Sequence, residues 1–163
     1  MKKIILFIVG VIIVSCNHNQ SNQKFEKNLE LAKQWFEKWE AEDINALSDM
    51  ISEEVEWQGA FYGQPLITNK SGLIDYINGW IGAMENINYE ANTFLPGHNP
   101  ETGLPDGSVR TYGTWTGKNT ASGIDFKVLF YHYLNFDENG MVTEGGDFGD
   151  ATGTVVAVSQ KTE

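Results

Sequence analysis

The apolar and polar positions divide the chain into a helical first part and a strand-rich second part. Phe25, Leu29, Ala32, Phe36 and Trp39 recur at steps of three and four residues. This spacing places them on one face of a helix, and charged residues occupy the positions between them. The pattern therefore predicts an amphipathic helix that packs its apolar side against a core.

Two more helices and one strand are expected before the pattern changes. Asp43 can cap a second, short helix, since its side chain can accept from free backbone N–H groups. A short strand follows over residues 54–61 and includes Trp57. Asn69 or Ser71 then opens a third helix. Its apolar stripe consists of Leu73, Ile77, Trp80 or Ile81, and Met84.

After Asn86 the apolar period changes to two, which is typical of strands. The alternation predicts strands over residues 87–93, 109–116, 123–136 and 141–148. Asn139-Gly140 lies between the last two, and Asn-Gly is the strongest short hairpin signal. Consecutive hairpins predict an antiparallel, curved sheet. Helices followed by strands, with one helix inserted after the first strand, indicate an α+β fold.

The longest strand has two distinct faces. One face is apolar except for His132, so we expect it to meet the helices. The other face carries Leu129, Tyr131 and Tyr133. An exposed face of this kind often contacts another subunit, which predicts a homodimer.

The start of the chain has the layout of a secretory signal peptide. Lys2 and Lys3 precede an apolar run over residues 4–14, which is too short to span a membrane. The segment that ends at Cys16 resembles the lipobox of bacterial lipoproteins. The resemblance implies cleavage before Cys16 and attachment of fatty acyl chains such as palmitate. We therefore expect a signal peptide over 1–15, a lipidated tether over 16–24 and one domain over 25–163, anchored to the envelope membrane and facing the periplasm.

The charge excludes one class of function. The net charge is −11, and it becomes −13 once Lys2 and Lys3 leave with the signal. Such a surface repels nucleic acid and anionic lipid head groups. We therefore expect no nucleic-acid partner, and we expect the lipid anchor to be the only contact with the membrane. With Cys16 acylated no thiol remains, because the chain has one cysteine. The histidines at 18, 98 and 132 lie far apart, so we expect no metal site and no cofactor.

The chain resembles a SnoaL-like domain of the nuclear transport factor 2-like superfamily. The resemblance covers about residues 25–158 and rests on the order of elements, on the hairpin over 136–144 and on Gly146-Asp147-Phe148 leading into residues 150–153. It implies a cone-shaped half-barrel, in which a curved sheet packs against three helices and encloses a pocket. In the family's enzymes an acid–base pair in that pocket acts on polyketides, steroids or other small molecules.

The resemblance also implies two site residues. Asp147 matches the aspartate that acts as acid or base in the polyketide cyclases, and His132 matches an inward histidine on the preceding strand. Gly145 and Gly146 replace the histidine or aromatic residue common there, which predicts a wide site. The alternatives are a core histidine and an aspartate that only anchors the two glycines. The expected pocket walls are Trp57, Trp80, Tyr112, Trp115, Phe126 and Phe130.

Three functions are compatible with this pattern. The first is a pocket that binds a small hydrophobic molecule without converting it. The second is a cofactor-independent isomerase, cyclase or hydratase that uses Asp147 and His132. The third is a structural subunit of an envelope complex. The enzyme requires the side chains of Asp147 and His132 to point into one closed cavity, and the absence of any cavity would favour the structural subunit.

Overall fold

The structure is a computed structural model that describes residues 23–159. The expected signal peptide and Cys16 lie outside the described residues. Gln23 and Lys24, expected to end the tether, are already helical. Within residues 23–159, no helix is long and apolar enough to cross a membrane.

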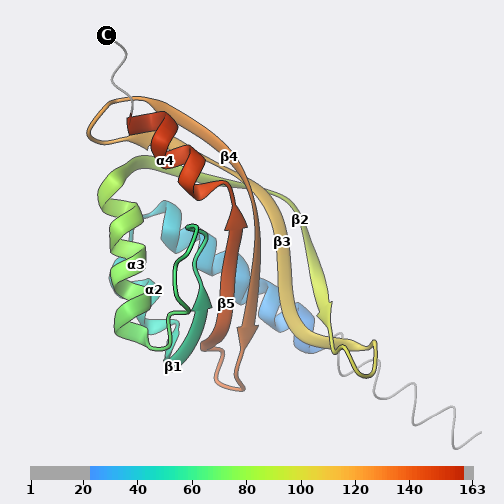
Figure 1. Cartoon of the computed structure of the whole chain (residues 1–163). Coiled ribbons are helices and arrows are strands. Elements are labelled where there is room, and N and C mark those ends of the chain that lie inside the picture. The colour runs from blue at the N-terminus through green and yellow to red at the C-terminus, as the bar shows by residue number, and fades with distance from the viewer. Residues whose placement is uncertain (1–22, 160–163) are drawn as a thin grey trace, which may run out of the picture.

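The described part begins with an N-terminal helix over residues 23–40. The elements that follow are α2 (Ile44–Asp49), β1 (Ile51–Gln58), α3 (Lys70–Ala83), β2 (Met84–His98), β3 (Pro105–Asn119), β4 (Asp125–Phe136), β5 (Val142–Gly149) and α4 (Ala151–Ser159). Figure 1 shows the sheet curving around the helices, with α4 across one end.

Side-chain caps begin two of the helices where the sequence predicts them. Asp43 Oδ1 accepts from the backbone N–H of Ala46 at 3.0 Å and starts α2. Asn69 Oδ1 accepts from the N–H of Gly72 at 2.8 Å and starts α3. Each cap satisfies a donor that has no partner within its own helix. Of the two starts expected for the third helix, Asn69 is the N-cap.

The five strands form one sheet in the order β1-β5-β4-β3-β2. β2 to β5 pair antiparallel with their sequence neighbours, as the hairpin pattern predicts. β1 pairs parallel to β5, so the sheet is mixed, where the sequence predicted only antiparallel pairing. The reason is topological: the chain leaves β1 through α3 and re-enters the sheet at the far edge. β1 therefore occupies the edge of the sheet beside β5.

The turn between β4 and β5 forms where the Asn-Gly signal lies. Asp137 Oδ1 accepts from the backbone N–H of Asn139 at 2.9 Å and of Met141 at 2.8 Å. Gly140 has φ 85°, a left-handed conformation that favours glycine. The N–H donors, that of Met141 foremost, hold the pKa of Asp137 below its usual range. This turn sets the register that places β5 against β4.

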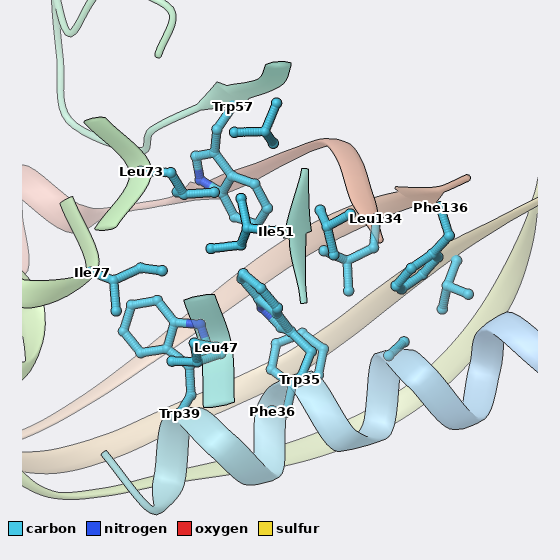
Figure 2. Close-up of a cluster of buried hydrophobic side chains, with 14 of the residues drawn as sticks. Trp35, Phe36, Trp39, Leu47, Ile51, Trp57, Leu73, Ile77, Leu134 and Phe136 are labelled. Carbon is cyan, nitrogen blue, oxygen red and sulfur yellow. The ribbon is translucent and has the colours of Figure 1, made fainter. Parts of the chain in front are cut away.

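The core lies between the helices and the concave face of the sheet. Figure 2 shows Trp35, Phe36 and Trp39 projecting from one side of the N-terminal helix into a cluster that includes Trp57 and Leu134. Trp35, 2% exposed, belongs to this face although the predicted stripe omits it. Large aromatic side chains therefore fill the space between the N-terminal helix and the sheet.

The sequence reasoning missed α4. Six of its nine residues are Thr, Val or Gly153 and a seventh is Ser159, which form helices less readily than alanine, so the local pattern is weak. Asp150 Oδ1 accepts from the N–H of Gly153 at 2.9 Å and caps the helix. Val158, 2% exposed, packs with Met84 and Ile87. Tertiary packing therefore stabilises this helix more than its own propensity does.

Candidate functional site

His132 and Asp147 are direct cross-strand partners on β4 and β5. Both point to the inner face, and they are 5% and 8% exposed. Nδ1 of His132 lies 2.7 Å from Oδ1 of Asp147. The hairpin turn at residues 137–141 aligns the two strands, so the local sequence and the sheet register together create this pair. The structure thus brings together the two side chains that the sequence analysis selected.

The second carboxylate oxygen of Asp147 accepts two hydrogen bonds. Oδ2 accepts from Trp57 Nε1 at 3.1 Å and from the Tyr76 hydroxyl at 2.9 Å. Together with His132, three donors surround one carboxylate. A carboxylate that accepts from this many donors has few lone pairs left for a ligand. Trp57 on β1 and Tyr76 on α3 therefore fix the orientation of the Asp147 carboxylate.

Tyr76 is a site residue that the sequence analysis missed. It lies on α3 directly before Ile77 and four residues before Trp80, so the helical spacing could have revealed it. Burial, and then the negative charge of Asp147, raises the pKa of Tyr76 far above its usual value. The phenol therefore keeps its hydrogen and remains a donor to the carboxylate.

The remaining ring nitrogen of His132 meets an indole. Trp115 Nε1 donates to Nε2 of His132 at 2.8 Å, across β3 and β4. Three aromatic rings surround the imidazole with centroid distances of 5.2 Å to Phe36, 5.4 Å to Tyr89 and 5.5 Å to Phe130. His132 bonds only to side chains here and to no backbone carbonyl, contrary to the alternative of a core histidine held by the backbone.

Tyr89 adds a second hydrogen-bonded layer behind the imidazole. Its hydroxyl lies 3.0 Å from Thr111 Oγ1, which in turn donates to the Thr93 carbonyl at 2.9 Å. Thr111 has one hydrogen, so Tyr89 is the donor of the first bond. Burial raises the pKa of Tyr89 to about 12. The ring also stacks on Phe36 with centroids 4.2 Å apart, which fixes one wall beside His132.

A small cavity adjoins the pair. The centre of a water-sized sphere can occupy about 60 Å³ of this cavity. This is enough for about four to six waters, so a ligand of drug size would require the walls to move. Apart from the indole nitrogens of the tryptophans, its polar side-chain atoms come from Tyr76, His132 and Asp147. The apolar walls are Trp35, Phe36, Trp39, Trp80, Met84, Ile87, Trp115, Phe126, Val128 and Phe130.

The end of α4 packs behind the apolar wall of this cavity. Val158 packs with Met84 and Ile87, and partly buried Trp80, Trp115 and Phe126 join the same cluster. All but Val158 line the cavity itself. The helix α4 therefore supports this wall from outside the cavity.

The expected pocket walls lie at different places in the structure. Trp80, Trp115, Phe126 and Phe130 line the cavity. Trp57 is 1% exposed and lies behind the carboxylate, where its indole N–H binds Asp147. It supports the site from the core instead of forming a wall.

Tyr112 is not part of the cavity, and its selection as a pocket residue was wrong. It is 49% exposed and pairs with Tyr131 on the outer face of the sheet. Their ring centroids are 5.0 Å apart. The reason is strand alternation, because Tyr112 and Trp115 are three residues apart and an unbroken strand directs such residues to opposite faces.

The two glycines do not widen the site, so that expectation was also wrong. Gly145 pairs with Trp57 across β5 and β1, and a Cβ on Gly145 would overlap the indole ring. A Cβ on Gly146 would come within 2.7 Å of the Tyr133 ring on the outer face. Gly145 therefore allows Trp57 to occupy the space that a side chain would take.

The described residues offer no metal centre. Among residues 23–159, no three side chains of His, Cys, Asp or Glu gather closely enough to hold an ion. His98 ends β2 and is exposed, far along the chain from His132. The chemistry that this arrangement can supply is hydrogen bonding and proton transfer at His132, oriented by Asp147.

No protein-family model and no curated protein matches the sequence. Solved structures do. An NTF2-like protein of unknown function from Burkholderia pseudomallei matches with a TM-score of 0.66 and 14% identity, over 82% of this chain and 98% of that chain. The chain has the nuclear transport factor 2-like fold.

Other proteins with this fold are similar to the same extent. A protein from Jannaschia sp. CCS1, named for its likeness to SnoaL-like polyketide cyclases, has a TM-score of 0.70 and 14% identity, over 84% of this chain and 94% of that one. The epoxide hydrolase/cyclase-like enzyme SalBIII, described in pyran ring formation in the polyether salinomycin, has a TM-score of 0.65 and 18% identity, over 78% and 93%. At such identities the likeness shows a shared fold.

Proposed function

We propose that this protein is an envelope lipoprotein whose nuclear transport factor 2-like domain binds a small, mostly apolar molecule between the sheet and α3. The observation that supports binding is the cavity itself. Its walls are almost entirely aromatic and aliphatic, while the polar atoms converge at the His132–Asp147 end. This combination of an apolar wall with few oriented polar groups is typical of small-molecule sites.

The lipid anchor and the cavity have compatible roles in this proposal. Acylated Cys16 would hold the domain at the membrane on the periplasmic side. The cavity would then sample small hydrophobic molecules close to the bilayer. The size of the cavity favours a compact ligand, on the order of five non-hydrogen atoms, unless half-buried Trp80 or Phe126 moves aside.

Two neighbouring residues on β4 allow a controlled test. Val128 lines the cavity, whereas Leu129 is 67% exposed on the opposite face. Val128→Phe should fill the cavity, and Leu129→Phe adds the same ring outside it. We expect cyclopentanol or a similar small ring compound to raise the melting temperature of the wild-type chain and of Leu129→Phe, since a ligand bound only to the folded state stabilises it. Val128→Phe should show no such rise. Equal rises in all three proteins would contradict binding in this cavity.

One observation favours a catalytic alternative, a cofactor-independent isomerase, cyclase or hydratase. Asp147 orients His132 through Nδ1, as a positioning carboxylate does in hydrolytic dyads, and Nε2 is then the atom able to take a proton. Asp147 itself is surrounded by donors and would be the positioning residue.

The test of this alternative is deuterium exchange at the carbon next to the carbonyl of cyclopentanone, followed by NMR in heavy water. Faster exchange with wild type than with His132→Phe would support catalysis, and equal rates would leave binding alone. Absence of both binding and exchange would favour the structural subunit.

A further inference from the structure

We infer that the cavity selects ligands with a hydroxyl group over ligands whose polar group can only accept hydrogen bonds, such as a carbonyl. The inference rests on the proposed ligand-binding function and specifies the chemical class of the ligand. It follows from the direction of the hydrogen bonds between Trp115, His132 and Asp147.

The direction of these bonds is determined by the indole. An indole nitrogen carries a hydrogen and offers no acceptor lone pair, so Trp115 can only donate. At 2.8 Å its partner, Nε2 of His132, must be the acceptor and carries no hydrogen. His132 is therefore the neutral tautomer with its hydrogen on Nδ1. That hydrogen goes to Oδ1 of Asp147 at 2.7 Å.

The polar atoms of Tyr76 and Asp147 beside this pair are acceptors as well. Tyr76 gives its hydrogen to Oδ2 of Asp147, and its oxygen accepts from the backbone N–H of Ala60 at 3.4 Å. The same Oδ2 also accepts from Trp57. If Asp147 turned toward a ligand, the Trp57 N–H or the Tyr76 hydroxyl would lose its acceptor. Within this group, Trp115 N–H is the donor that a ligand can reach, and Nε2 of His132 is the acceptor beside it.

A ligand that reaches this end of the cavity must separate Trp115 from His132. A hydroxyl can accept from the indole and donate to Nε2 at the same time, so both protein groups keep a partner. A carbonyl can accept from the indole but leaves Nε2 unpaired among aromatic rings. Sites built to pair with a hydroxyl discriminate strongly against analogues that cannot do so. We expect the alcohol to bind at least about tenfold more tightly than the matching ketone.

The test compares cyclopentanol with cyclopentanone, which share one ring skeleton, by calorimetric titration of the full chain. Wild type should prefer the alcohol at least about tenfold. Trp115→Phe should keep this preference, because Nε2 still needs a donor. His132→Phe should lose or reverse it, because the free indole N–H then needs an acceptor. Equal affinities in wild type would overturn the selectivity and leave the proposed binding intact. Binding of neither ring compound would count against the proposed function itself.

A second measurement requires no ligand. Nitrogen-15 NMR of the imidazole distinguishes the two neutral tautomers, and the chain has three histidines, so His132 is assigned by comparison with His132→Phe. The inference expects the hydrogen on Nδ1 and none on Nε2. A hydrogen on Nε2 would overturn it, whatever the titrations show, because Trp115 could then not be the donor to that atom.

Discussion

Gly145 lies against the indole ring of Trp57, its partner across the parallel pairing of β5 and β1. A methyl group at position 145 would overlap the ring, which is 1% exposed and has no free space to move into. Because Trp57 also donates to Asp147, the absence of a side chain at Gly145 is part of what positions the carboxylate. A glycine that appeared to open the site is instead what allows the site to be closely packed.

The first prediction concerns this contact. Gly145→Ala should lower the free energy of unfolding by about 1–3 kcal/mol, the usual cost of adding a group to a packed core. Gly79→Ala is the control, since Gly79 lies inside α3 with open space around its Cα. That change should stabilise the protein by about 0.5–1 kcal/mol through helix propensity. Urea unfolding curves measure both, and an unchanged midpoint for Gly145→Ala would contradict the packing described.

The second prediction concerns the proton arrangement around His132. Asp147→Asn places an NH2 group against the imidazole Nδ1, so the ring hydrogen must move to Nε2 and face the Trp115 N–H. Two donors then meet, and we expect a loss of about 1–3 kcal/mol in the free energy of unfolding. Adding Trp115→Phe removes one of them, so the double variant should be more stable than the sum of the single changes predicts.

A double-mutant cycle measures this coupling, which should be on the order of 1 kcal/mol. The control cycle combines Asp147→Asn with Phe126→Leu. Phe126 lines the same cavity, and its side chain has no hydrogen-bonding group that could join Asp147, His132 and Trp115. Additive effects in both cycles would show that the tautomer of His132 does not depend on Asp147.

The third prediction concerns alkaline pH. Burial raises the pKa of Tyr89 to about 12 and that of Tyr76 further, from an unfolded value of 10.0. A raised folded pKa contributes stability that is fully present below pH 10 and is lost as the pH rises through the folded value. The free energy of unfolding should therefore fall above pH 10, by up to about 1.4 kcal/mol per pH unit for each buried tyrosine.

Chemical denaturation between pH 9 and 11 tests this dependence. Tyr76→Phe should reduce the slope, whereas Tyr62→Phe, at a side chain that is 97% exposed, should leave it unchanged. The same slope in wild type and Tyr76→Phe would mean that Tyr76 ionises as easily in the folded protein as in the unfolded chain.

The fourth prediction concerns assembly through the outer face of the sheet. Tyr131 lies there between Tyr112 and Phe148, with ring centroids 5.0 and 5.7 Å away. Tyr112, Leu129 and Phe148 are 49%, 67% and 49% exposed. We expect a homodimer that covers this aromatic face, and Tyr131→Glu should convert it to monomer by placing a charge at the apolar centre of the interface. Analytical ultracentrifugation of the full chain in detergent measures the mass. Val156→Glu on α4 is the control, at a side chain that is 54% exposed. A wild-type monomer at high concentration would exclude the dimer.

The fifth prediction concerns the membrane anchor. Cys16→Ser should leave unprocessed precursor and abolish labelling with a fatty-acid probe, because the thiol that receives the lipid is absent. Ser15→Ala is the control, since it keeps a small residue before the cysteine and should be processed normally. Normal processing of Cys16→Ser and release of a soluble mature protein would refute the lipoprotein assignment.

The sequence by itself determined the elements whose pattern is strong and local. The helical stripe from Phe25 to Trp39, the Asp43 and Asn69 caps and the Asn139-Gly140 turn each depend on neighbouring residues, so periodicity and turn chemistry reveal them. The inward direction of His132 also followed from alternation along one long strand. These features were enough to predict the α+β fold and the inward direction of His132, whereas Asp147 was selected because the chain resembles a SnoaL-like domain.

Only the tertiary structure decided how that pair is used. The parallel pairing of β1 with β5 brings Trp57 to Asp147 across 90 residues of sequence, and α3 brings Tyr76 to the same oxygen across 71. Trp115 reaches His132 through the register of β3 and β4. Contacts between elements distant in the sequence leave no local periodic signal, because each depends on how whole strands and helices pack. The helix α4 is the clearest case, since its residues form a helix poorly alone and are held by the surface they cover.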